Sequence, residues 1–193
     1  MDQKKMRRLC AHLLDDQNLL NLSVPADPTD LFAALCTGMS KRHKHPFEHR
    51  LVNFPANTVS GLWVATTDRH FMLVEADTPP EHQLVILGHE FWHVEIDAGK
   101  TEPLAAHEAN ALLAPDIDTN TVHNLATRVA ARSSCGQQEE VACELFGSLL
   151  GSRARRWLEE EDGSVPASSA EYVHRLNAAL GSASRSGGSR WMA

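Results

Sequence analysis

The sequence lacks the features that define several common protein classes. Its 193 residues contain four cysteines, and no two of them form a Cys-x-x-C pair: Cys10, Cys36, Cys135 and Cys143. This spacing argues against a disulfide framework and against a cysteine-only zinc site. No apolar run approaches the ~20 residues that a membrane-spanning helix needs. The N-terminal segment also lacks the long apolar stretch of a secretory signal, because charged residues recur within it.

Positive charge is also scarce. The chain has 18 Lys and Arg against 25 Asp and Glu, a formal net charge of -7. A protein with this balance is poorly suited to holding nucleic acid, so we expect no direct nucleic-acid partner. One segment, residues 41–50 (KRHKHPFEHR), is cationic and rich in histidine. We interpret it as a solvated connector, with a partner contact as the less favoured alternative. We expect a soluble, cytoplasmic protein.

The first half of the chain predicts three helices and a small sheet. Apolar residues recur at helical spacing in residues 2–18 and 28–39, and a proline stands at the first helical position of the second segment. Short apolar segments bounded by turn residues predict three strands, the last two forming a hairpin: 51–54, 61–65 and 71–75. Residues 81–97 follow a Pro-Pro pair and are largely apolar, which predicts a buried helix.

The second half of the chain predicts further helices. Helical patterns appear in four segments: 105–113, 121–132, 134–160 and 170–180. The third opens on Ser134-x-x-Gln137, a capping-box pattern. The tail, 181–193, is rich in Gly, Ser and Arg, and we expect it to be disordered. The chain is therefore predicted to form one α+β domain, residues 1–180, mainly helical, with an antiparallel sheet of about three strands before the helix at 81–97.

A metal-binding motif lies inside that buried helix. His89 and His93 are four residues apart, so both imidazoles lie on one helix face and can reach one metal ion. Glu90 directly follows the first histidine, where it can take a proton from a water bound to that metal. Zinc lowers the pKa of such a water toward ~7. The motif therefore predicts a hydrolytic zinc site.

A zinc site of this kind needs a third protein ligand. A histidine six residues after His93 would supply it in one large class of proteases, but that position is Gly99. The alternative is a carboxylate from a second helix, and the best candidates lie in residues 138–150. There a small residue, Ala142, would allow the two helices to pack closely. His107 and His123 are possible substitutes.

These two segments together resemble the ImmA/IrrE family of metallopeptidases. The resemblance consists of His89-Glu90-x-x-His93, followed some 45 residues later by Glu139-x-x-Ala142 and an apolar run. The chain is similar to short actinobacterial members that are described as toxin or regulator components of toxin–antitoxin-like systems. Further shared features cover roughly residues 2–155: a basic opening helix, Gly61-Leu62-Trp63, Pro79-x-x-His82-Gln83 and Arg132-Ser133-Ser134.

The resemblance implies a complete site. By the family pattern, His89, His93 and Glu139 are the ligands of Zn²⁺ and Glu90 is the general base, with Glu140 as the alternative third ligand if the register differs by one residue. The family pattern also implies a zincin-like α+β fold and cleavage of a protein partner, typically a helix-turn-helix repressor. Such cleavage relieves transcriptional repression.

The chain departs from the family at two positions. Trp92 stands where the family usually has glycine, and its indole would either narrow the metal pocket or fill the core. Cys143 stands where the family carries an acidic or amide residue, and a thiol orients a ligand histidine poorly. No residue stands out as the donor to a developing oxyanion. Tyr172 fits better as a structural aromatic than as this donor. The alternatives, which the sequence does not rank, are four histidines: His70, His82, His107 and His123.

The sequence therefore favours a zinc-dependent endopeptidase that acts on a protein partner. The alternative is a catalytically weak or inactive zincin-fold binding protein that sequesters a regulator along the edge of the hairpin. Trp92 and Cys143 motivate that alternative. A toxin that attacks another cellular target is a third, less favoured hypothesis.

Overall fold

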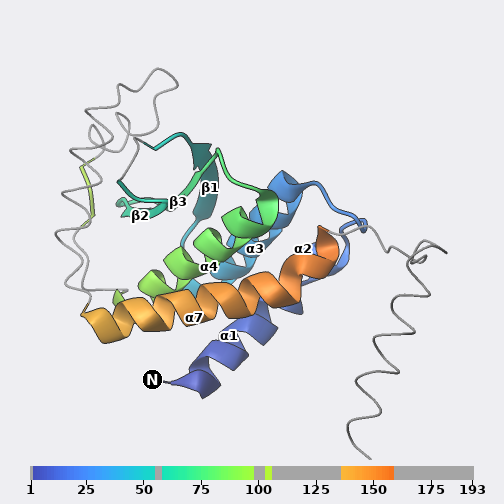
Figure 1. Ribbon diagram of the computed structural model, residues 1–193, viewed down its shortest axis with the longest axis horizontal. Coiled ribbons are helices and arrows are strands. Elements are labelled where there is room, and N and C mark those ends of the chain that lie inside the picture. Colours follow the sequence, from blue (N-terminus) through green and yellow to red (C-terminus); the bar gives the residue numbers. More distant parts are fainter. Residues whose placement is uncertain (1, 55–57, 98–102, 106–135, 159–193) are drawn as a thin grey trace, which may run out of the picture. The chain divides into compact units, whose positions relative to one another are not determined.

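The computed structural model describes residues 2–54, 58–97, 103–105 and 136–158, and Figure 1 shows their arrangement. These residues belong to one compact unit, Met1–Glu160. The helices predicted at 105–113, 121–132 and 170–180, the tail at 181–193 and the domain boundary at 180 lie outside the described residues. Within the described part, the fold is α+β with a small three-stranded sheet, as the sequence predicted.

Three helices precede the sheet, and each begins at an aspartate that accepts a backbone hydrogen bond. They are α1 (Gln3–Leu14), α2 (Gln17–Leu20) and α3 (Pro28–His43). The single helix predicted at 2–18 is interrupted because the Asp16 carboxylate accepts from the Asn18 backbone N–H at 2.9 Å and starts a new helix. Asp27 caps α3 in the same way, through the Thr29 N–H at 2.8 Å.

The basic segment 41–50 is not the connector that the sequence predicted. Lys41, Arg42 and His43 form the last turn of α3, where positive side chains complement the negative end of the helix dipole. Lys44 then adopts a left-handed conformation, with φ of 55°, and ends the helix. The first strand follows almost at once and begins at Phe47.

The sheet is mixed rather than antiparallel. Its strands are β1 (Phe47–Val52), β2 (Gly61–Ala65) and β3 (His70–Glu75), in the spatial order β1-β3-β2. The predicted hairpin is confirmed, because β2 and β3 pair antiparallel. The antiparallel prediction is wrong for β1, which pairs parallel to β3. β1 and β2 are the two edge strands, and β3, the last strand in the chain, lies between them. β2 is therefore an edge strand of this sheet.

Two long helices, α4 (Pro80–Asp97) and α7 (Gln137–Ala154), lie side by side, with α4 packed on the sheet and α7 packed on α4 (Figure 1). Glycines allow their close approach. A Cβ atom on Gly147 would lie 2.5 Å from the Val85 carbonyl oxygen, and one on Gly88 would lie 3.0 Å from the Gly147 Cα. A short 3-10 turn, Arg155–Trp157, follows α7. The N-cap of α7 is Gly136 rather than the predicted Ser134, which lies outside the described residues.

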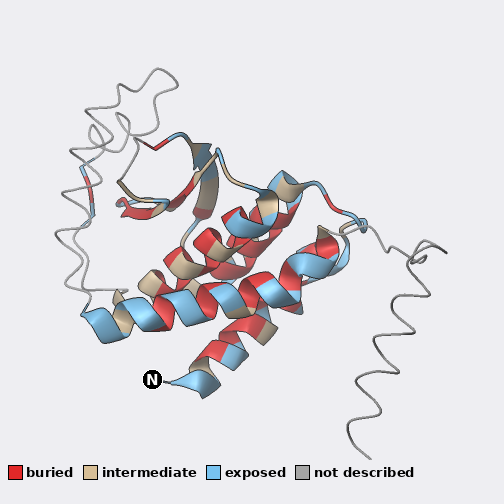
Figure 2. Cartoon of the chain, in the orientation of Figure 1, coloured by how far each residue is buried: buried red, intermediate tan, exposed pale blue. Residues whose placement is uncertain are grey.

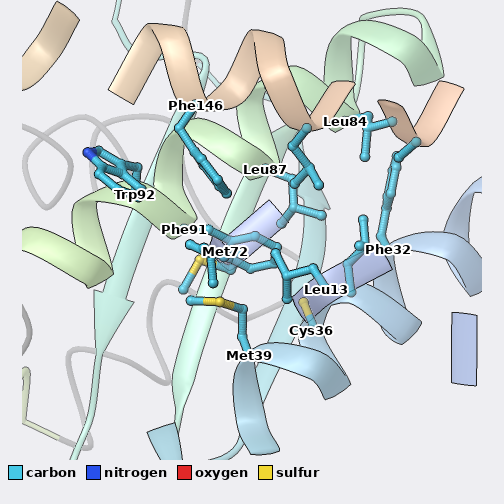
Figure 3. Close-up of a cluster of buried hydrophobic side chains, with 14 of the residues drawn as sticks. Leu13, Phe32, Cys36, Met39, Met72, Leu84, Leu87, Phe91, Trp92 and Phe146 are labelled. Atoms are coloured by element: carbon cyan, nitrogen blue, oxygen red, sulfur yellow. The ribbon is translucent and has the colours of Figure 1, made fainter. Parts of the chain in front are cut away.

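The core lies between the inner face of the sheet and helices α3 and α4, and it continues between these helices and α1 and α7. Helices α1, α3 and α7 turn a buried side inward and an exposed side outward, whereas α4 has no exposed residue from Gln83 to Asp97 (Figure 2). The largest buried side chains interlock at the centre of this cluster, among them Phe32, Phe91 and Phe146 (Figure 3). None of the helices in the described part of the chain has the length and apolar character that crossing a membrane would require.

Candidate metal centre

Helix α4 brings the two predicted histidines together. His89 and His93 lie one turn apart, with their Nε2 atoms 2.9 Å from each other and their ring centroids 4.7 Å apart. Two nitrogens bound at ~2.1 Å to one tetrahedral zinc ion would lie ~3.4 Å apart. The two rings therefore already converge on one point, as the spacing in the sequence predicted.

Helix α7 presents a glutamate to both rings. The two carboxylate oxygens of Glu140 lie 3.6 Å from His89 Nε2 and 3.8 Å from His93 Nε2. These distances are too long for good hydrogen bonds but match a carboxylate that shares an ion with both rings. The Glu140 side chain is 49% exposed, so it can move by the small amount that binding would need.

Glu139, which the resemblance implied as the third ligand, is not brought to the histidines. Its carboxylate accepts a hydrogen bond from the Gly136 backbone N–H at 3.2 Å and caps the start of α7. It lines a different cavity, on the Trp92 side of the two helices. Successive helical residues point about 100° apart, so a one-residue shift in register exchanges the two glutamates. The close contact at Gly147 sets that register.

Cys143 completes a group that is positioned to bind a metal ion. Its sulfur and one ring nitrogen from each of His89 and His93 all lie within 4.8 Å of one another. Cys143 is reduced and fully buried, and it follows Glu140 by three residues on the same side of α7. The sequence analysis treated this cysteine only as a departure that weakens the site. The arrangement by itself leaves the identity of the metal open.

Glu144 is a further site residue that the sequence analysis missed. Its Oε1 lies 3.7 Å from Nδ1 of His89, the ring nitrogen that faces away from the candidate metal position. A carboxylate there can orient the ring and raise its basicity. Glu144 follows Glu140 by four residues and therefore lies on the same face of α7. The sequence points to Glu144 only once it is known that Glu140, and not Glu139, faces the histidines.

Glu90, the predicted general base, lies buried next to the site. Burial raises the pKa of its carboxyl to about 8, opposed by a hydrogen bond from the Trp63 backbone N–H and aided by the nearby Glu140 charge. Gly61 on β2 packs directly against it, since a Cβ there would lie 2.6 Å from the Glu90 Oε1. For His93, burial and the neighbouring His89 lower the pKa, which favours the neutral imidazole that binds metals.

Five of these residues line one cavity of about 460 Å³: His89, Glu90, His93, Glu140 and Glu144. Residues 58–63, which lead into the edge strand β2, form one wall, and side chains of α4 and α7 form the other. His82, one of the unranked oxyanion donors, also lines the cavity. His70 does not, and its Nδ1 accepts a hydrogen bond from the Trp63 indole at 3.0 Å. The other donors considered, Tyr172, His107 and His123, lie outside the described residues.

Trp92 does not narrow this cavity. It is 2% exposed, and its indole stacks on Phe146 with ring centroids 5.0 Å apart. Figure 3 shows the two rings side by side at the margin of the core. Trp92 therefore fills space between α4 and α7, which is one of the two outcomes that the sequence left open.

Comparison with protein families, with curated proteins and with solved structures returned no match.

Proposed function

We propose that this chain is a zinc-dependent endopeptidase that acts on a protein partner. The carrying observation is the convergence of His89, His93 and Glu140 on one point beside the buried Glu90. Two imidazoles and a carboxylate are a donor set that suits zinc and leaves a fourth position open. The resemblance to the ImmA/IrrE family supports the same function.

The residues of the chain divide the chemistry among them. When bound, zinc would act as a Lewis acid and lower the pKa of a water molecule. Burial favours the protonated form of Glu90, but a cation bound next to it would favour the ionised form. In that form Glu90 would accept a proton from the attacking water and return it to the leaving amine. Glu144 faces the second nitrogen of the His89 ring at 3.7 Å and can orient that ring when the metal binds.

The edge strand β2 supports a peptide substrate rather than a small molecule. Within the described residues no other strand pairs with its outer edge. The Leu104 N–H does donate to the Ala65 carbonyl at 2.8 Å and the Trp63 N–H donates to Glu90, so a peptide would pair with the remaining backbone groups. An extended peptide can add to such an edge through backbone hydrogen bonds, which places its amide bonds next to the site. The family resemblance suggests a helix-turn-helix repressor as the partner.

The metal content of the purified protein tests this proposal. We expect about one zinc per chain, retained in Glu139→Ala and reduced in Glu140→Ala. The two variants remove the same group from adjacent positions and are therefore matched. Zinc loss in Glu139→Ala alone would restore the ligand set that the family pattern implied. Absence of metal at saturating zinc in the unaltered protein would exclude the catalytic proposal.

Cleavage is tested separately from metal binding. We would co-express the chain with candidate helix-turn-helix repressors from the same genome and detect fragments by mass spectrometry. Glu90→Gln should retain zinc and produce no fragments. If a repressor is inhibited equally by the unaltered protein and by Glu90→Gln, without fragments, the chain acts by sequestration. The same edge strand would serve that second function.

A further inference from the structure

We propose that Cys143 is itself a ligand of the metal ion, bound as a thiolate. This inference rests on the proposed function, because it concerns the same site. It adds a donor from α7 that the family pattern does not contain. With Cys143 as a ligand, the metal site of this chain would differ from a site made only of two histidines and a glutamate.

The placement of the sulfur carries the inference. Cys143 contributes an atom that lies within 4.8 Å of a ring nitrogen of both His89 and His93. A thiolate at ~2.3 Å and an imidazole at ~2.1 Å from one zinc lie ~3.6 Å apart, so a movement of about an ångström closes the geometry. Binding breaks the S–H bond, forms the S–Zn bond and releases the proton to solvent.

Burial distinguishes the two donors from α7. Cys143 is fully buried against α4, whereas the Glu140 side chain is 49% exposed. The fixed sulfur would therefore hold the ion together with the two histidines, and Glu140 would be the ligand that exchanges with water or substrate. Four protein ligands make a closed zinc site, and the departure of one opens it. The Cys143 thiolate would thus fill, at rest, the fourth position that the two histidines and Glu140 alone leave open, and a position for water would open when Glu140 moves.

The thiolate also determines which metal the site prefers. Soft sulfur ligands select zinc and other thiophilic ions over Mg²⁺, Ca²⁺ and Mn²⁺, which prefer oxygen. We expect the unaltered protein to bind zinc at least ~10-fold more tightly than Cys143→Ser, since even changes outside the ligand shell cost 10–100-fold in affinity. Serine keeps the size of the side chain while removing the thiolate.

Cobalt spectroscopy of the full chain is the decisive experiment. Tetrahedral Co²⁺ shows visible d–d bands, and a bound thiolate adds a sulfur-to-cobalt charge-transfer band in the near ultraviolet. We expect both in the unaltered protein, with the charge-transfer band lost in Cys143→Ala and retained in the matched variant Cys135→Ser. Circular dichroism of the metal-free variants checks their folding.

Three results would overturn the proposal, and they are distinguishable. If d–d bands appear without charge transfer in the unaltered protein, the metal site stands without Cys143, whether or not the variants fold. If the charge-transfer band is lost in Cys135→Ser but not in Cys143→Ala, another sulfur binds. If Co²⁺ does not bind at all, the proposed metal centre fails as well. If the spectra are as expected but no partner is cleaved, Cys143 is still a metal ligand. Only the proposed peptidase function is then overturned.

Discussion

At the scale of single residues, the contact between Gly61 and Glu90 is the tightest restraint on the proposed base. A Cβ at position 61 would lie 2.6 Å from the Glu90 Oε1 and 2.5 Å from a methyl carbon of Ile86. We expect Gly61→Ala to destabilise the protein by about 1–3 kcal/mol, the usual cost of overpacking. Urea denaturation measures this change.

A double-mutant cycle shows whether the cost arises at Glu90. In a Glu90→Ala background the carboxylate is absent, so Gly61→Ala should cost at least about 0.5 kcal/mol less than in the unaltered protein. Strictly additive costs would mean that the contact with Glu90 carries no strain and that Ile86 alone resists the new side chain.

Glu144 should affect zinc binding through His89 rather than directly. Its carboxylate lies 3.7 Å from His89 Nδ1, on the side of the ring away from the candidate metal position. We expect Glu144→Ala to weaken zinc affinity ~10-fold, as removal of such orienting groups does in other sites. Competition with a chromophoric chelator measures it. Glu81→Ala, which removes the same charge from the first turn of α4, should leave the affinity unchanged.

At the scale of elements, Glu95 joins α4 to two other helices. Its carboxylate is 4% exposed and lies within 3.3 Å of cationic groups of Lys5 on α1 and Arg42 on α3, with His43 Nε2 at 3.0 Å. Burial raises the pKa of Glu95, but the hydrogen bonds from His43 and Arg42 and the neighbouring positive charges outweigh it and hold the pKa well below its usual range. The ionised form therefore stabilises the folded state.

This stabilisation has a definite pH dependence. Since the folded pKa is depressed, the contribution is present above the unfolded value of ~4.3 and is lost as the pH falls below it. We expect Glu95→Gln to cost about 1–3 kcal/mol at pH 7, because its partners are partly solvated. The difference should shrink as the pH falls from ~5 to ~3.

The control for this prediction is Glu48→Gln. Glu48 pairs with Arg69 at 2.6 Å, but both side chains are 40% exposed, so the change should stay within about 1 kcal/mol. Chemical denaturation across the pH range measures both variants. A stability gap for Glu95→Gln that is constant with pH would contradict an electrostatic origin.

The contact between α4 and α7 is the other feature at this scale. A Cβ on Gly147 would lie 2.5 Å from the Val85 carbonyl oxygen and 3.1 Å from the His89 backbone nitrogen, and backbone atoms cannot easily yield. We expect Gly147→Ala to move the helices apart, with an overpacking cost of about 1–3 kcal/mol that is partly offset by better helix propensity. Zinc affinity should also fall, because the donors lie on both helices.

Gly136→Ala is the matched control on the same helix. Within the described part of the chain, a Cβ atom at position 136 would meet nothing within 4 Å, and the φ of -71° is one that any residue adopts. Zinc affinity should therefore be unchanged in this variant. Equal affinities in Gly147→Ala and Gly136→Ala, measured by chelator competition, would show that the separation of the helices does not control the site.

At the scale of the whole molecule, the proposed metal should stabilise the fold. His93 and Glu140 are 47 positions apart in the chain and meet only when α4 packs on α7. A ligand that binds only the folded state at 100 times its Kd adds about 2.7 kcal/mol to the free energy of unfolding. We expect zinc to raise the Tm, and EDTA to reverse the rise. The Tm of His93→Ala should not respond to zinc, and a rise equal to that of the unaltered protein would place the stabilising ion elsewhere.

The sequence by itself determined the parts of this protein that depend on local periodicity. Helical geometry fixes His89 and His93 on one face of α4 with Glu90 beside them, whatever surrounds the helix. The β2–β3 hairpin follows equally from two short apolar segments and a polar turn between them. In the same way, Asp27 before Pro28 is sufficient to start α3.

The tertiary structure decided what depends on how these elements pack. Adjacent glutamates have identical chemistry, so only the rotation of α7 against α4, set by the contact at Gly147, places Glu140 at the histidines and Glu139 at the helix cap. The same packing places Trp92 outside the lining of the cavity and brings the Cys143 sulfur near the two histidine rings. The parallel pairing of β1 likewise depends on the path of the chain across the sheet, for which local sequence carries no signal.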